Sequence, residues 1–325
     1  MIATIIQRAV MQGIPLLYGS TGEILTEKSG HLNLGIPGIM YVGAISGVAG
    51  AFIYEQSVAA VNPVIAVLIA FFSCIIGSLI MGLIYCFLTV TLRANQNVTG
   101  LALTTFGIGI GNFFGGSLIK ITNSDVPSIS LSATSGAFRT ALPFADKLGW
   151  FGDIFLSYGF LTYLAIIIAL ISSYVLKSTR VGLHLRAVGE SPTTADAAGI
   201  NVTKYKYLFT CIGSAIAGLG GLYYVMDYAN GVWSNNAFGD RGWLAIAIVI
   251  FALWKPRFSI LGSILFGGLY VIPMYIPGIS VSVKKLFEML PYVVTVIVLI
   301  FTSIRNKKEN QPPQALGLPY FREER

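Results

Sequence analysis

The segment from Pro63 to Leu92 contains no charged side chain, and the first charge after it is Arg93. A helix that spans the hydrocarbon core of a bilayer needs about 20 mostly apolar residues, so this run is long enough to cross a membrane. The whole chain is 55% hydrophobic and only 11% charged, whereas soluble domains carry about 25% charged residues. The sequence therefore predicts an all-α, polytopic transmembrane bundle in which lipid surrounds the helices.

Apolar runs of this kind recur along the chain and predict about nine spanning helices, with eight to ten as the range. The candidate spans are Ile5–Leu25, Leu34–Tyr54, Pro63–Leu92, Asn97–Ile119, Ile154–Leu176, Tyr205–Met226, Trp243–Trp254, Phe258–Tyr275 and Leu286–Ile304. The first run is the weakest, because it contains Arg8, Pro15 and Glu23. Many of the 36 glycines lie within these runs. We expect them to let helices approach closely, with broken helices that line a path as the alternative.

The runs divide the chain into a single transmembrane domain, residues 1–304, and a basic cytoplasmic tail, residues 305–325. Lys and Arg concentrate on the cytoplasmic side of membrane proteins. With nine spans and a cytoplasmic C-terminus, that side holds 14 of the 21 Lys and Arg residues and 7 of the 14 acids. We therefore expect the N-terminus outside the cell membrane and the C-terminus inside. Loop 120–153 is then external and loop 177–204 cytoplasmic.

The sequence lacks the motifs of covalent chemistry. It contains no G-x-x-x-x-G-K-[ST] loop, no H-E-x-x-H and no G-x-S-x-G, so we expect neither ATP hydrolysis nor another enzymatic reaction by this chain. Cys74, Cys86 and Cys211 all lie in apolar runs and are interpreted as small buried hydrophobes. We expect no metal and no cofactor. Most of the runs also lack acids, which argues against a proton-coupled carrier.

The predicted cytoplasmic loop contains the signals of a short helix. Ser191 is a favourable N-cap, Pro192 fits the first helical position, and Gly199 suits the residue after the C-terminus. About two turns fit between them, and a helix this short is marginal unless it docks on something. Two interpretations are open: a connecting helix on the membrane face, or a contact that receives motion from a cytoplasmic motor.

This loop carries a family resemblance. The pattern Gly182-x-x-x-Arg186-Ala187-Val188-Gly189-Glu190-x-Pro192-x-x-Ala195-x-x-Ala198-Gly199-Ile200 resembles the cytoplasmic loop of ABC-transporter permeases of the branched-chain amino acid/ribose type. The stretches Gly22–Gly38, Asn95–Leu103 and Gly239–Ala247 resemble the nucleoside branch of that superfamily, whose members are served by an external lipoprotein. Together, the four stretches are spread over nearly the whole chain.

The resemblance implies the permease subunit of an importer that moves nucleosides. It implies a second permease chain, expected to form a heterodimer with this one, ABC ATPase subunits that bind ATP and Mg, and an external substrate-binding lipoprotein. The basic residues stand singly or in pairs beside apolar runs and form no basic stripe with interleaved aromatics, so we expect no nucleic-acid partner. Contact with the ATPase falls on Arg186, Gly189, Glu190, Ser191, Pro192, Thr194, Ala195, Ala198 and Gly199. The alternatives are a simple sugar or branched-chain amino acid as cargo, an ion-coupled carrier or channel, and a membrane enzyme.

An uncharged polar solute needs hydrogen-bonding side chains within the membrane. Candidates for its path are Asn33, Asn97, Thr99, Thr104, Thr105 and Asn112, although hydrogen bonds between helices would explain the same residues. Thr104 and Thr105 are adjacent and cannot share a helix face. The Asn- and Gly-rich stretch Asp227–Arg241 is interpreted as an external loop, either one that meets a binding protein or a plain solvated one.

Overall fold

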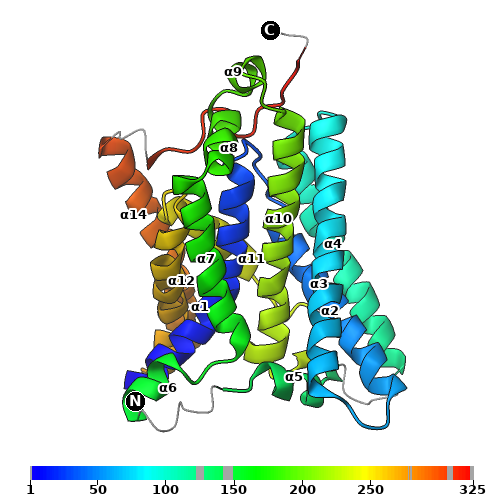
Figure 1. Cartoon of the computed structure of the whole chain (residues 1–325). Coiled ribbons are helices and arrows are strands. Elements are labelled where there is room, and N and C mark those ends of the chain that lie inside the picture. The colour runs from blue at the N-terminus through cyan, green and yellow to red at the C-terminus, as the bar shows by residue number, and fades with distance from the viewer. Residues whose placement is uncertain are drawn as a thin grey trace.

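The computed structural model describes residues 2–121, 128–141, 149–276, 278, 280–305 and 310–322. Long helices run side by side from one end of the bundle to the other (Figure 1). The first helix, α1 (Ile2–Glu27), begins at the end that holds α6 (Gly149–Phe155), where Gln7 Nε2 donates to the carbonyl of Asp153. The helices α8 (Arg180–Glu190) and α9 (Pro192–Ala197) lie at the opposite end, together with tail residues 310–322. We call this end the α9 end.

The remaining helices are listed here in chain order: α2 (Ile36–Ser57), α3 (Pro63–Cys86), α4 (Gln96–Ile121), α5 (Ser132–Phe138), α7 (Phe160–Ser178), α10 (Val202–Tyr223), α11 (Arg241–Phe251), α12 (Pro256–Val271), α13 (Val281–Glu288) and α14 (Leu290–Arg305). π-Helical turns extend α3 and α10, as η1 (Phe87–Thr91) and η3 (Tyr224–Tyr228), and a 3₁₀ turn, η4 (Ile272–Met274), follows α12. Two short strands, β1 (Ile129–Ser130) and β2 (Val232–Trp233), pair antiparallel with Ile129 opposite Trp233.

Within the described residues, six helices are long and apolar enough to cross a membrane. They are Ile36–Ser57, Pro63–Thr91, Gln96–Ile121, Phe160–Ser178, Val202–Tyr228 and Pro256–Met274. The protein is thus a multi-pass membrane protein, but the prediction of about nine spans is not confirmed. The other predicted spans are also helical. Polar residues and Pro15 interrupt the apolar run of α1, whereas α11 and α14 have only 11 and 16 residues.

Close approach between helices confirms the expected role of the glycines, as two contacts between long helices illustrate. A Cβ on Gly22 of α1 would lie 2.3 Å from the carbonyl oxygen of Gly213 in α10. A Cβ on Gly107 of α4 would lie 2.6 Å from the carbonyl oxygen of Gly38 in α2. Since lipid gives helices no hydrophobic reason to associate, this backbone proximity supplies the packing contacts of the bundle.

The stretch between α10 and α11 is not a plain solvated loop. Trp233 and Phe238 are buried, and the Tyr41 ring of α2 meets Trp233 edge to face with ring centroids 5.1 Å apart. Asn235 and Asn236, by contrast, stay exposed. Of the predicted external loop 120–153, the described parts form β1, α5 and α6. Residues 122–127 and 142–148 of this loop lie outside the described residues.

Candidate coupling surface and solute path

Helix α9 forms where its capping residues predict it. The Ser191 hydroxyl accepts a hydrogen bond from the Thr194 amide, Pro192 occupies the first turn, and Gly199 adopts φ +81° after the helix end. The amide of Ile200 returns to the carbonyl of Ala195 at 3.0 Å, which closes the C-terminus. A side chain is strained at such a φ, so glycine suits this position.

Docking explains why a helix of six residues is stable. Ala195 is buried and packs with Val188 of α8 and Val202 of α10 in a small hydrophobic cluster, flanked by Tyr205 and Tyr320. Thr193, Thr194 and Ala197 on the other side of this helix are exposed. Helix α9 is therefore fixed to the bundle along one face and free along the other.

A cavity of about 290 Å³ lies between the end of α8 and α9, beside the docked Ala195. It is lined by Ala187, Glu190, Ser191, Thr194, Ala195, Ala198 and Ile200. Five of the predicted coupling residues thus meet around one hollow. Small side chains on its rim leave room for a side chain from another protein. Of the remaining four, Arg186 is exposed on α8, Pro192 is half-buried at the start of α9, and Gly199 is exposed after it.

Gly189 has a different role. It is buried, and a Cβ at this position would lie 2.4 Å from the carbonyl oxygen of Lys28, so only glycine fits without displacing the backbone. Its own carbonyl accepts a hydrogen bond of 3.0 Å from the amide of Ala315 in the tail. Gly189 therefore joins α8 to the α1–α2 loop and to the tail instead of facing outward.

The C-terminal tail packs across the α9 end in a way that sequence reasoning missed. The amide of Gly317 donates to the carbonyl of Gly30 at 3.2 Å, and Gln96 Nε2 of α4 donates to the carbonyl of Leu318 at 3.3 Å. Tyr320 donates its hydroxyl hydrogen to Asp196 Oδ2 at 2.8 Å, and the same oxygen lies 3.3 Å from Arg322 Nε. The tail contains no periodic apolar pattern that could reveal these contacts.

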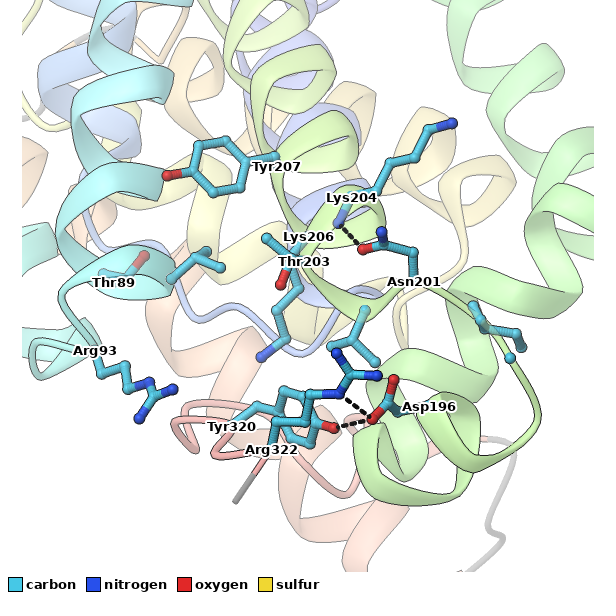
Figure 2. A pocket seen from close by; sticks show the side chains of 14 residues that line it. Thr89, Arg93, Asp196, Asn201, Thr203, Lys204, Lys206, Tyr207, Tyr320 and Arg322 are labelled. Carbon is cyan, nitrogen blue, oxygen red and sulfur yellow. Dashed lines mark hydrogen bonds and ion pairs between the residues drawn. The ribbon is translucent and has the colours of Figure 1, made fainter. Parts of the chain in front are cut away.

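A second cavity, of about 720 Å³, opens beside the tail (Figure 2). Its walls come from the end of α3 and η1, from the α9–α10 junction and from the tail. The lining residues are Thr89, Val90, Arg93, Asp196, Gly199, Ile200, Asn201, Val202, Thr203, Lys204, Lys206, Tyr207, Tyr320 and Arg322. Positive side chains outnumber the single acid among them.

Three of the predicted path residues lie near the α1–α2 loop. Asn33 is buried. Its backbone amide donates to Glu23 Oε1 at 3.0 Å, and its side-chain oxygen accepts from the backbone amide of Gly35. Thr104 donates to the carbonyl of Leu34 at 2.7 Å, and Thr99 is buried on the same helix. The hydrogen bonds of Asn33 and Thr104 fix the loop to α1 and α4.

The other three lie elsewhere. Asn97 and Thr105 are exposed, and Thr105 donates back to the carbonyl of Leu101 within its own helix. As expected, Thr104 and Thr105 face different surroundings. Asn112 is half-buried farther along α4, where its Oδ1 accepts from Tyr41 at 2.5 Å and its Nδ2 donates to Asn236 Oδ1 at 2.9 Å. The six candidates therefore do not form one cluster.

The Asn112 contacts identify polar residues that sequence reasoning did not select. The Tyr41 hydroxyl also accepts from the backbone amide of Asn236 at 2.8 Å. Tyr41, Asn112 and Asn236 thus form a closed set of hydrogen bonds, in which each residue bonds to the other two. Nearby, the Arg241 guanidinium lies 4.5 Å from the ring centroid of Tyr224 and donates to the carbonyl of Phe238. A tryptophan within an Asn- and Gly-rich stretch was the available signal that this stretch is anchored.

A family model described as the permease component of the branched-chain amino acid transport system matches residues 5–299. The chain belongs to this permease family. It is similar to a nucleoside ABC transporter permease protein of Lactococcus lactis, with 32% identity over 91% of this chain and 90% of the relative. It is also similar to a guanosine ABC transporter permease protein of Bacillus subtilis, with 28% identity over 100% and 98% of the two chains. A putative glucose ABC transporter permease protein of Haloferax volcanii is 28% identical over 99% and 98%.

As a member of this family, the chain is a transport subunit, and its several apolar helices place it in a membrane. The family match begins within α1 and ends within α14, before the tail. The tail contacts at Gly189, Gln96 and Asp196 thus join residues outside the matched region to residues within it.

Proposed function

We propose that this chain is the permease subunit of an ATP-driven importer whose cargo is a nucleoside. The observation that carries the proposal is end-to-end similarity to permeases named for nucleosides and for guanosine, each matched over at least nine-tenths of both chains. A second cargo, a simple sugar such as glucose, is supported by the similarity to the putative glucose permease at 28% identity.

The driving energy comes from partner ATPase subunits, which bind the ATP and Mg, because this sequence has no P-loop motif. The ATPase contacts α9, whose outer face is free, and a side chain of the ATPase enters the hollow bordered by Glu190, Thr194 and Ala198. Docking of Ala195 against Val188 and Val202 passes the motion of α9 to α8 and α10. Arg186, Ser191, Pro192 and Gly199 shape this contact, and Gly189 holds α8 against the α1–α2 loop.

A second permease subunit completes the path, and we expect a heterodimer fed by an external substrate-binding lipoprotein. The N-terminus lies outside the cell membrane, and α9 and the tail lie inside. This orientation is supported by the positions of the start of α1 and of helix α9 at opposite ends of the bundle (Figure 1) and by the excess of Lys and Arg assigned to the inner side. The polar set of Tyr41, Asn112 and Asn236 contributes hydrogen bonds to the path. Asn33, Asn97, Thr99, Thr104 and Thr105 are its other candidates.

Crosslinking tests the coupling surface. A cysteine at Thr194, which is exposed, is expected to crosslink to an engineered cysteine in a co-expressed ATPase, whereas a cysteine at the neighbouring Ala195, which is 3% exposed, is not. Equal failure of both cysteines in an assembled complex would contradict the docking surface. In parallel, Ala198→Arg and Glu190→Lys are expected to abolish ATP-driven uptake without reducing membrane insertion.

Uptake into vesicles tests the cargo. Vesicles that contain the complete complex should accumulate labelled guanosine only with ATP, and unlabelled adenosine should compete, whereas glucose and leucine should not. If glucose competes with the labelled solute and adenosine does not, the result would favour a simple sugar as the cargo. Transport by this chain alone, without ATP, would reject the importer and indicate a channel or an ion-coupled carrier.

A further inference from the structure

Lys206 is the unusual residue of the 720 Å³ cavity at the α9 end. Only 2% of its surface is exposed to solvent. Among the described residues, none hydrogen-bonds to its ammonium group or forms an ion pair with it. Burial of an ammonium group is costly unless an anion compensates its charge. The cost at Lys206 indicates that a negatively charged partner belongs in this place.

The direction of the side chain shows where that partner lies. Figure 2 shows the Lys206 ammonium pointing into the cavity, between Arg93 on one side and Tyr320 and Arg322 on the other. Lys204, two residues earlier on α10, also borders the cavity, where its backbone amide donates to Asn201 Oδ1, but its side chain points away from the cavity in the same view. The two lysines therefore differ in their relation to the cavity although they share a helix.

Further positive charge converges on the same space. Arg93 and Arg322 line the cavity, and the N-terminal residues of α10, Asn201 to Thr203, form part of its wall. The N-terminus of a helix carries the positive end of the helix dipole. Asp196 is the only acid among the described lining residues, and it already accepts a hydrogen bond from Tyr320 and pairs with Arg322.

We propose that this cavity is a binding site for a phosphate group, with Lys206 as its central ligand and Arg93 and Arg322 at its rim. A phosphate carries more charge than a carboxylate and accepts several charge-assisted hydrogen bonds, which matches three cations around one space. The volume of about 720 Å³ leaves room for an organic part attached to the phosphate. Two sources supply this chemistry: a soluble phosphate ester of the cytoplasm or the headgroup of an anionic lipid.

Binding at this site can be measured without cargo and without the ATPase. A negative binding result would therefore not contradict the proposed import function, and a negative transport result would not contradict the binding site. Only the cytoplasmic location of the site rests on the proposed orientation.

The test compares Lys206→Met with Lys204→Met in the purified full-length chain in detergent. Methionine keeps the length and apolar stem of lysine and removes a charge that costs stability, so Lys206→Met should fold. Adenosine monophosphate and inorganic phosphate are the probes, and the readouts are equilibrium binding and the shift of the unfolding temperature. The wild type and Lys204→Met should bind alike. Lys206→Met should bind about tenfold more weakly or worse, because one charge-assisted contact is lost.

A second arm places the same three proteins in lipid nanodiscs of phosphatidylglycerol or of phosphatidylcholine. If the lipid headgroup is the ligand, phosphatidylglycerol should raise the unfolding temperature of the wild type and of Lys204→Met but not of Lys206→Met. A response to the soluble probes or to phosphatidylglycerol that depends on Lys206 supports the proposal and identifies the source. The proposal is overturned if Lys206→Met responds like the wild type in both arms, or if the wild type responds in neither.

Discussion

The Tyr320 hydroxyl hydrogen-bonds to Asp196 Oδ2 at 2.8 Å, across 124 residues of sequence, and so ties the C-terminal tail to the helix proposed to meet the ATPase. Arg322 lies 3.3 Å from the same oxygen, but its side chain is 72% exposed, so this ion pair contributes little. The half-buried tyrosine contact is the stronger of the two links. Motion of α9 is thus expected to reach the tail, and through Gly317 and Gln96 the α1–α2 loop and α4.

Tyr320→Phe should loosen the tail from α9. The substitution removes one hydrogen bond, worth about 1 kcal/mol, and leaves the aromatic ring in place. Hydrogen exchange is the direct measurement, and the amides of Ala315 and Gly317 should exchange faster than in the wild type. Arg322→Gln is the control, with a much smaller expected change. Unchanged exchange in Tyr320→Phe would show that the tail is held without this contact.

Gly107→Ala should destabilise the contact of α2 with α4, whereas Gly109→Ala should not. A Cβ on Gly107 would meet backbone atoms of Gly38 at 2.6 to 2.8 Å, but a Cβ on Gly109 meets nothing within 4 Å. Overpacking of this kind costs about 1–3 kcal/mol. Thermal unfolding in detergent should show a lower midpoint for Gly107→Ala only. Equal midpoints for the two variants would contradict the close approach of the helices.

Asn112→Ala should weaken the attachment of the segment between α10 and α11. The Asn112 side chain accepts from Tyr41 and donates to Asn236, so its removal opens the closed set of hydrogen bonds. We expect lower nucleoside uptake by the complete complex and faster proteolysis near Asn236. Ser117→Ala on the same helix is the matched control, because Ser117 is not a path candidate and its hydroxyl donates to the carbonyl of Phe113 within α4. Equal uptake and equal proteolysis in the two variants would contradict the role of Asn112.

The contribution of His31 to the stability of the protein should fall as the pH drops below 6.5, the ordinary pKa of histidine. His31 lies in the loop between α1 and α2, and burial, followed by repulsion from the Lys206 ammonium, holds its pKa well below that value. The unfolded state then binds a proton that the folded state does not, so the contribution of His31 is complete above pH 6.5 and is lost toward the lower, folded pKa.

Thermal unfolding between about pH 5 and 8 measures this effect in the wild type and in His31→Gln. Glutamine preserves a polar partner for Thr210, whose Oγ1 lies 3.0 Å from His31 Nδ1. The variant should lose part of the acid sensitivity while its unfolding midpoint at pH 8 stays close to that of the wild type. The same acid sensitivity in both proteins would assign it to another group.

Local features were predictable because the residues that cause them are neighbours in sequence. Ser191, Pro192 and Gly199 act within a few residues of one another, and helix α9 has the bounds that they predict. The long run from Pro63 likewise became the 29-residue helical span Pro63–Thr91. The span count was less predictable, since α1 is long but interrupted by polar residues and α11 is short, and composition alone does not show whether such helices cross a membrane.

The sequence by itself determined that the chain is a membrane-embedded helical bundle with a capped helix exposed between two long ones, because apolar length and capping are local properties. Only the tertiary structure decided which polar residues meet. Asn112 reaches Asn236, Tyr320 reaches Asp196, and Lys206 enters a cavity shared with the tail, all between segments far apart in the chain. Such contacts depend on how whole helices pack, and no pattern within a single segment specifies them.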